Sequence, residues 1–242
     1  MRIRSALLDA HGFVHGFSTR EGGVSEGPFG SLNLARTVGD DPAHVAENAR
    51  RFAKALGGPR LFEVSQVHGR VVVEVGAAPV EAVRPVEADG LVAAQPGDAV
   101  AVRTADCVPI LLGNVETGAV AAVHAGWRGV EARIVAVAVA RLGAPSALVA
   151  AIGPHIRLDA FEVSEEVAER ITAVAHGTVV VEARDPRPHV DLAAAVRAQL
   201  AHAGVERVDD VGGCTHAEPA RFFSHRRDAG RTGRHLSAIV AR

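Results

Sequence analysis

The sequence predicts an α+β fold, with mixed β-sheets flanked by helices in a single domain over residues 1–242. Two observations point to this class. Helix-period and β-branched segments interleave irregularly, and several strand-like segments follow one another directly, which disfavours a doubly wound parallel sheet. No low-complexity linker or internal repeat divides the chain, and its 48% apolar residues are enough for a sizeable core.

Four helices are predicted from capping residues and apolar periodicity. The clearest has Asp41 as its N-cap, Pro42 at the first helical position and Gly57 just past its end. Apolar side chains recur along it with the helical period, which predicts one buried face. The same signals place three more helices, at residues 131–142, 164–175 and 191–203.

Strands are predicted where β-branched residues cluster between turn residues. These segments are 71–75, 99–103, 108–112, 119–124, 147–152, 178–182 and 207–211. By contrast, residues 17–34 are dense in glycine, serine and proline, which predicts a long loop. Long ordered loops often contact ligands, so Arg20 and Asn33 are candidate substrate-binding residues. The alternative is a surface loop that pairs its own polar groups.

The overall composition excludes several kinds of partner. With 26 basic and 28 acidic residues, a general nucleic-acid surface is not expected. No apolar run is long enough for a membrane helix, and residues 1–4 do not begin a signal peptide, so we expect a cytoplasmic protein without membrane contact. The only two cysteines, Cys107 and Cys214, suit catalysis or metal binding better than a disulfide framework.

The most informative stretch is residues 104–129. Cys107 precedes one apolar strand-like run and His124 ends the next, with turn residues between the runs, so the two side chains are expected to face each other. His68 precedes the strand predicted at 71–75. Two imidazoles and a thiolate form a catalytic zinc set that leaves a fourth position open. Taken singly, each of the three could also be an ordinary loop or core residue.

Residues beside this trio suggest further roles. Asp106 and Gln66 could orient the ligands. Trp127 could stack on a base and Arg128 could bind phosphate or a carboxylate, although a core tryptophan and a surface ion pair would explain them as well. Asp89 is a candidate general acid or base, or simply a turn residue.

Several known signatures are missing. The chain has no Gly-x4-Gly-Lys or Gly-x-Gly-x-x-Gly motif, which removes the usual support for nucleoside triphosphate hydrolysis and dinucleotide binding. The combination of His-x-Glu with Pro-Cys-x-x-Cys that marks zinc base deaminases is also absent, because the chain has no Pro-Cys-x-x-Cys segment. No His-x-His segment occurs, which disfavours a trinuclear copper oxidase.

The chain as a whole resembles the YfiH family of purine nucleoside phosphorylases, formerly labelled multicopper polyphenol oxidases or laccase-like proteins. The motifs that carry the resemblance are Ser18-Thr19-Arg20, Ser31-Leu32-Asn33-Leu34, Gln66-Val67-His68-Gly69, Ala88-Asp89-Gly90, Thr104-Ala105-Asp106-Cys107-Val108-Pro109 and His124-Ala125-Gly126-Trp127-Arg128-Gly129.

This resemblance implies a YfiH-like fold and zinc held by His68, Cys107 and His124. It also implies phosphorolysis of adenosine, inosine and methylthioadenosine to free base and ribose 1-phosphate, with an adenosine deaminase side activity. The chain departs from the family pattern at His155, Phe161 and His225, which bears on the shape of the substrate pocket.

The leading hypothesis is that zinc positions one reactant while Arg20 and Arg128 hold phosphate for attack on the ribose. One alternative is a cysteine hydrolase with Cys107 as nucleophile, His124 as base and Asp106 nearby, which edits peptidoglycan precursors as some relatives are thought to do. A purine-binding protein without turnover is another. Copper is the second choice of metal, and a monomer or homodimer is expected.

Overall fold

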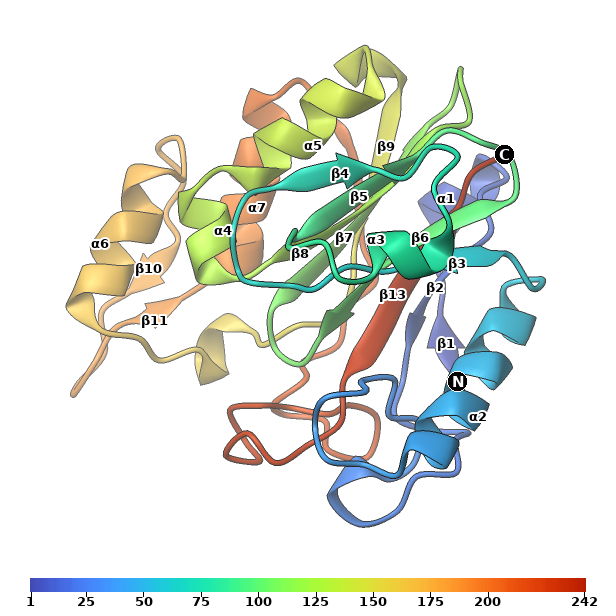
Figure 1. Ribbon diagram of the computed structural model, residues 1–242. Helices are drawn as coiled ribbons and strands as arrows, with labels where there is room; N and C mark the ends of the chain where they lie inside the picture. Colours follow the sequence, from blue (N-terminus) through green and yellow to red (C-terminus); the bar gives the residue numbers. More distant parts are fainter.

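Two β-sheets pack face to face between two layers of helices in the computed structural model, which describes all 242 residues (Figure 1). The first sheet has five strands in the order β1-β2-β13-β6-β3. Their bounds are β1 (Arg2–Ile3), β2 (His15–Ser18), β13 (His235–Val240), β6 (Asp98–Thr104) and β3 (Arg60–Phe62). Only β3 and β6 are parallel neighbours in this sheet.

The second sheet has six strands in the order β12-β9-β7-β8-β5-β4. Their bounds are β12 (Arg207–Asp210), β9 (Leu148–Ile152), β7 (Val108–Asn114), β8 (Val120–Ala125), β5 (Gly90–Ala93) and β4 (Val72–Glu74). The pairs β12/β9 and β4/β5 are parallel and the others antiparallel. Both sheets are therefore mixed, and the predicted α+β class is confirmed. A separate small ladder joins β10 (Val181–Glu182) to β11 (His189–Val190).

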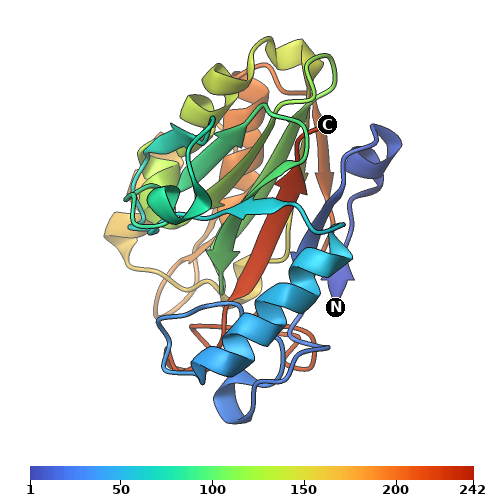
Figure 2. The same ribbon diagram turned by 45° about the vertical axis from the view of Figure 1, so that its right-hand side comes forward.

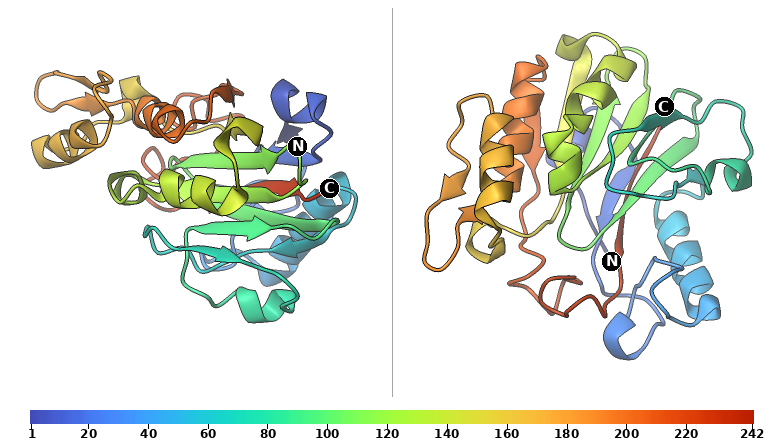
Figure 3. Two further views of the ribbon diagram at one scale, coloured as in Figure 1. Left: turned by 90° about the horizontal axis from the view of Figure 1, so that it is seen from above. Right: turned by 60° about the vertical axis from the view of Figure 1, so that its left-hand side comes forward.

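Helices cover the outer face of each sheet (Figures 2 and 3). On the six-stranded sheet lie α4 (Trp127–Glu131), α5 (Ile134–Leu142) and α7 (Leu192–His202), with α6 (Glu165–Ala173) packed against α4 and α7. The five-stranded sheet is covered by α2 (Pro42–Ala55), and two short helices, α1 (Ala6–Ala10) and α3 (Val80–Val83), lie in connections. None of these helices is long and apolar enough to cross a bilayer.

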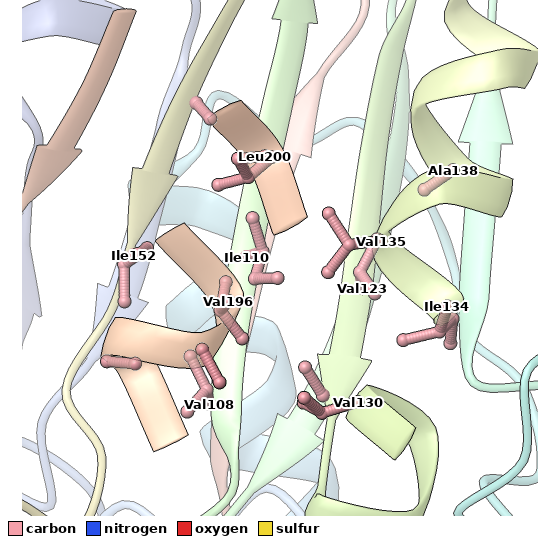
Figure 4. Close-up of a cluster of buried hydrophobic side chains, with 14 of the residues drawn as sticks. Val108, Ile110, Val123, Val130, Ile134, Val135, Ala138, Ile152, Val196 and Leu200 are labelled. Carbon is pink, nitrogen blue, oxygen red and sulfur yellow. The ribbon is translucent and has the colours of Figure 1, made fainter. Parts of the chain in front are cut away.

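The alternation of side chains along each strand divides the interior into separate cores. On β7, Val108 and Ile110 face the helices, where they pack in one cluster with Val196 of α7 (Figure 4). Leu111, on the opposite face of the same strand, packs in the cluster between the two sheets. Since side chains alternate with a period of two, a fully buried central strand must be apolar on both faces.

Sequence signals located the four longest helices, α2, α5, α6 and α7, whereas the short α1, α3 and α4 were not predicted. Asp41 caps α2 by accepting a 2.7 Å hydrogen bond from the Ala43 N–H, as predicted. The start of the helix predicted at 131–142 is wrong, since α5 begins at Ile134. Arg133 adopts φ 60° in the left-handed region and separates α4 from α5. That conformation is unusual for a residue with a Cβ, and the sequence contains no glycine there to announce it.

Six strands were not predicted, namely β1, β2, β3, β5, β11 and β13, although β13 is the central strand of its sheet. Its sequence, HLSAIV, mixes polar and apolar residues without strict alternation, and its identity as a strand depends on pairing with β2 and β6. The strand predicted at 178–182 is shorter than expected, since only Val181 and Glu182 pair with a neighbour.

Candidate metal centre and its cavity

The β7–β8 hairpin brings the cysteine and one histidine together. In its register Pro109 lies opposite His124 and Val108 opposite Ala125, so Cys107, which immediately precedes β7, lies next to the end of β8. The sequence predicted this arrangement from turn residues between two β-branched runs, and the hairpin is confirmed.

His68 reaches the same place through a backbone turn that Asp89 holds. The buried Asp89 carboxylate accepts backbone hydrogen bonds from Val67 at 3.2 Å, His68 at 2.9 Å and Gly69 at 2.6 Å. His68 itself has φ 60°, a conformation that costs energy for a residue with a side chain. The three hydrogen bonds stabilise this turn, and Asp89 stands directly before β5, the neighbour of β8.

The three donor atoms are close enough to share an ion. One ligand atom each from His68, Cys107 and His124 lies within 4.8 Å of the others, and Nε2 of His68 is 4.0 Å from Sγ of Cys107. The two imidazole rings meet edge to face, with centroids 4.7 Å apart. Nitrogen and sulfur ligands of one tetrahedral zinc ion lie roughly 3.6 Å apart, so a small closing movement would complete the geometry.

Asp89 also determines which nitrogen of His124 is available. Nδ1 of His124 donates a 2.7 Å hydrogen bond to Oδ1 of Asp89, and both side chains are buried. Asp89 thereby engages Nδ1, and Nε2 is the nitrogen that His124 can offer to a ligand, as in many histidine metal sites. Burial alone would raise the pKa of Asp89, but the hydrogen bonds from His124 and Gly69 lower it below its ordinary value.

The charges within the trio are coupled. Burial alone would raise the pKa of the Cys107 thiol, but the His124 charge and hydrogen bonds from both histidines lower it. Burial disfavours protonated His124, yet the adjacent Cys107 and Asp89 raise its pKa overall. The thiolate is the form of cysteine that binds metals and attacks electrophiles, so the surroundings of Cys107 favour its reactive form.

Gly126 leaves room for this arrangement. A Cβ at this position would lie 3.0 Å from Cδ2 of His68 and 3.1 Å from Sγ of Cys107. The backbone there has φ −72°, which any residue can adopt, so glycine is required for space and not for conformation. The three donors are therefore packed around a backbone position that has no side chain.

The trio opens into a cavity of about 700 Å³. The cavity wall combines apolar side chains with an unusual number of arginines and one carboxylate, that of Asp106. The arginines are Arg36, Arg84, Arg103, Arg128, Arg226 and Arg234, and the largest apolar side chains are Trp127, Ile156, Phe161 and Leu192. Apolar side chains beside convergent polar groups are typical of small-molecule sites, and the excess of arginine indicates an anionic ligand.

Three of the predicted substrate-binding residues line this cavity. Trp127 and Arg128 lie at the start of α4, and the Arg128 guanidinium carbon is 4.3 Å from the centroid of the indole ring. Gln66 also lines the cavity, but its amide exchanges two 2.7 Å hydrogen bonds with the backbone of Arg103. Gln66 therefore holds two wall segments together, and its amide has little capacity left for substrate.

Arg20 and Asn33 do not line the cavity, contrary to expectation. The Arg20 guanidinium donates to the carbonyl groups of Gly30 and Pro219, both at 2.8 Å, and stacks on Phe223. Asn33 is fully buried, and its side-chain oxygen accepts a 2.9 Å hydrogen bond from the backbone N–H of Arg234. Both residues satisfy loop backbone groups, which is the alternative role the loop composition allowed.

The two aspartates also take roles different from those expected. Asp89 is enclosed and does not line the cavity, so it holds His124 and the His68 turn and is not placed to exchange protons with substrate. Asp106 does not contact the ligand atoms. Its carboxylate accepts hydrogen bonds from the Thr215 hydroxyl at 2.6 Å and the Arg226 N–H at 2.7 Å, which fastens a C-terminal loop over the cavity.

The remaining predicted positions divide between cavity and core. Cys214 does not join the donor trio, and both cysteines are free thiols. Phe161 and His225 line the cavity, whereas His155 is fully buried elsewhere. The cavity residues that the sequence analysis did not single out are chiefly Arg36, Arg84 and Arg234. They lie in loops or at a helix end, and none belongs to a recognisable motif.

Comparisons with known proteins identify the family. Residues 14–242 match the family described as multi-copper polyphenol oxidoreductase laccase. A purine nucleoside phosphorylase of Deinococcus radiodurans is 44% identical over 93% of this chain and 88% of its own length, and YfiH of Escherichia coli, also named a purine nucleoside phosphorylase, is 40% identical over 92% and 91%.

Solved structures show the same fold. The crystal structure of YlmD from Geobacillus stearothermophilus superposes with a TM-score of 0.89 at 36% identity, covering 96% of this chain and 92% of that one. A Neisseria meningitidis protein gives 0.86 at 37% identity, covering 94% and 93%. By its family match, its relatives and its fold, the chain belongs to the YfiH family of purine nucleoside phosphorylases.

Proposed function

We propose that this protein is a zinc-dependent purine nucleoside phosphorylase. Its substrates would be adenosine, inosine and methylthioadenosine, cleaved with phosphate to free base and ribose 1-phosphate, with deamination of adenosine as a side activity. The observation that supports this best is the His68, Cys107 and His124 donor set, which opens into a cavity that holds both an aromatic face and several arginines. Relatives named as purine nucleoside phosphorylases, about 40% identical, support the same reaction.

The donor set suits zinc on chemical grounds. Two neutral imidazole nitrogens and one thiolate are ligands that zinc prefers, and three protein ligands leave the fourth tetrahedral position open. The hydrogen bond from His124 to Asp89 presents Nε2 toward the other donors, and Gly126 keeps side-chain atoms away from them. A bound zinc ion would supply a Lewis acid that polarises an oxygen of a reactant.

The protein's own residues would bind and orient the two substrates. Trp127 offers an aromatic face at the cavity wall, suited to stacking on a purine ring. Arg128 makes no ion pair and keeps its donors free for an anion or a ribose oxygen. Holding phosphate and nucleoside together in one cavity converts a reaction between two free molecules into one between bound neighbours, which lowers the entropic part of the barrier.

The test is to replace Cys107 by alanine and to measure zinc content and ribose 1-phosphate release together. We expect zinc stoichiometry to fall well below one per chain and phosphorolysis to be lost. Cys214→Ala is the matched control, because that thiol lies outside the donor trio and should leave both quantities unchanged. Full phosphorolysis by Cys107→Ala with undiminished zinc content would exclude the proposal. If the wild-type protein binds purines but releases no ribose 1-phosphate, it is a binding protein and not an enzyme of this class.

One observation favours a second candidate, a cysteine hydrolase. Asp89, His124 and Cys107 form a chain of contacts in which a carboxylate orients an imidazole beside a thiol of lowered pKa, the arrangement that activates catalytic cysteines. Metal analysis and alkylation separate the two candidates. Activity that persists in metal-free protein and disappears when iodoacetamide modifies Cys107 would favour the hydrolase, and protection of Cys107 by zinc would favour the phosphorylase.

A further inference from the structure

Besides Arg128, which stacks on Trp127, two arginines in the cavity wall form no ion pair, side-chain hydrogen bond or aromatic contact with the protein. Arg36 stands in the connection between β2 and α2, and Arg84 directly follows α3. Both side chains line the cavity that contains the donor trio. Neither guanidinium forms an ion pair, and Nε of Arg84 is buried without any hydrogen-bond acceptor.

The surroundings of Arg36 and Arg84 carry more positive than negative charge. Arg36 is exposed overall, but partial burial lowers its pKa and the charge of Arg84 lowers it further, so the two guanidinium groups repel each other. Arg103, the third arginine of this part of the wall, has its pKa lowered to about 10 by burial and by Arg36. Glu63 is the carboxylate that pairs with Arg103, which leaves three arginines against one acid.

Such an arrangement is unfavourable in the empty protein. An unsatisfied buried donor costs free energy, and like charges in a partly desolvated place repel. A ligand that supplies several oxygens and negative charge removes both costs at once. Phosphate fits this requirement, because its oxygens accept parallel hydrogen bonds from the forked donors of arginine.

We propose that Arg36 and Arg84 form the phosphate-group subsite of this cavity. This inference rests on the proposed function for the reaction in which the phosphate takes part. The binding of a phosphate group at this place is argued from the unpaired guanidinium groups alone. The sequence suggested Arg20 as a phosphate-binding residue, and Arg36 and Arg84 take its place in this proposal. The Arg20 guanidinium instead donates hydrogen bonds to the carbonyl groups of Gly30 and Pro219. Arg128, stacked on Trp127, is then left for the nucleoside.

The direct test measures phosphate binding without catalysis. Thermal unfolding of wild type, Arg36→Gln, Arg84→Gln and Arg141→Gln would be followed with increasing inorganic phosphate at constant ionic strength. Arg141 is an exposed arginine at the end of α5, outside the cavity, and serves as the control. We expect phosphate to raise the Tm of wild type and Arg141→Gln and to leave the two cavity variants nearly unaffected.

A second property separates this role from a merely structural one. Without phosphate, Arg84→Gln should unfold at the same temperature as wild type or higher, because the substitution removes a repulsion and an unsatisfied donor. In steady-state phosphorolysis, each cavity variant should raise the KM for phosphate about 10- to 100-fold and leave the KM for nucleoside within about twofold, as expected when one charge-assisted contact is lost.

Adenosine 5′-monophosphate is the comparison ligand, since the bound phosphate group could belong to free phosphate or to a phosphorylated substrate. Loss of the inorganic phosphate response in the cavity variants identifies free phosphate as the occupant. Loss of the nucleotide response alone identifies a phosphorylated substrate. Unchanged responses to both ligands would overturn the subsite. A phosphate response that depends on these arginines in a protein without phosphorolysis would overturn the proposed function and keep the subsite.

Discussion

Oδ1 of Asp89 accepts hydrogen bonds from the side chain of His124 and from the backbone N–H of His68, at 2.7 and 2.9 Å. One buried carboxylate thus orients one metal-ligand candidate and holds the backbone turn of another. The two histidines are 56 residues apart in the chain, and Asp89 is the direct link between them. Their relative position therefore depends on a residue that is not itself among the three donors.

Replacing Asp89 by asparagine should weaken metal binding by about 10- to 100-fold, the usual cost of losing a group that orients a ligand. Asparagine can still accept from His124 and the His68 N–H through its oxygen, but its NH₂ group, in place of Oδ2, cannot accept the N–H groups of Val67 and Gly69. Zinc affinity by competition with a chromophoric chelator measures the effect. Asp98→Asn is the control: it is also buried but pairs with Arg60 away from the cavity, so it should lower stability and leave zinc affinity unchanged.

Gly126→Ala should damage the metal centre sterically. The new Cβ would lie 3.0 Å from His68 and 3.1 Å from Cys107, so at least one donor must move. We expect zinc affinity and phosphorolysis to fall at least tenfold, because a catalytic geometry tolerates little displacement. The metal-free variant should unfold within about 1 kcal/mol of wild type, since its φ of −72° is not strained by alanine. Unchanged zinc affinity would show that the donors can separate freely.

Removing the metal should lower stability as well as activity. A ligand that binds only the folded state adds about 4 kcal/mol to the free energy of unfolding at a thousand times its Kd. Dialysis against a strong chelator should therefore lower the Tm, and added zinc should restore it. Cys107→Ala provides the comparison, because its Tm should respond much less to either treatment. Equal responses of the two proteins would place the stabilising ion elsewhere.

Two buried histidines predict a loss of stability in mild acid. Burial lowers the pKa of His155 to about 4 and that of His235 to about 3. Below pH 6.5 the unfolded chain binds protons at both residues while the folded protein does not, so stability falls with decreasing pH from about 6.5 down to these values. Each histidine contributes up to roughly 1.4 kcal/mol per pH unit in that window.

Denaturant unfolding at pH 7, 5.5 and 4.5 measures this slope. The informative comparison is wild type against His235→Gln, in which an amide oxygen can still accept the Phe223 N–H that bonds to Nε2 of His235. The variant should be less stable at pH 7, because a buried ring is replaced, and should lose less stability on acidification. Parallel pH profiles for the two proteins would show that His235 is not neutral in the native state.

The sequence by itself determined the local parts of this protein. The Asp41-Pro42 cap, the apolar runs of β7 and β8 and the turn between them depend on neighbours within a few residues, so they could be predicted, and with them the meeting of Cys107 and His124. His68 was nominated as a third donor, and the fold class followed from the irregular order of elements.

Only the tertiary structure decided how these parts are completed. Asp89 bonds to His124, 35 residues further along the chain. The strand β13 becomes central through partners more than 130 residues away. Arg36 and Arg84 come from separate connections and line the same cavity. It also removed Arg20 and Asn33 from the site, because their polar atoms are used by loop backbone. Contacts of this kind arise from sheet pairing and packing, and no short sequence pattern records which distant residues will become neighbours.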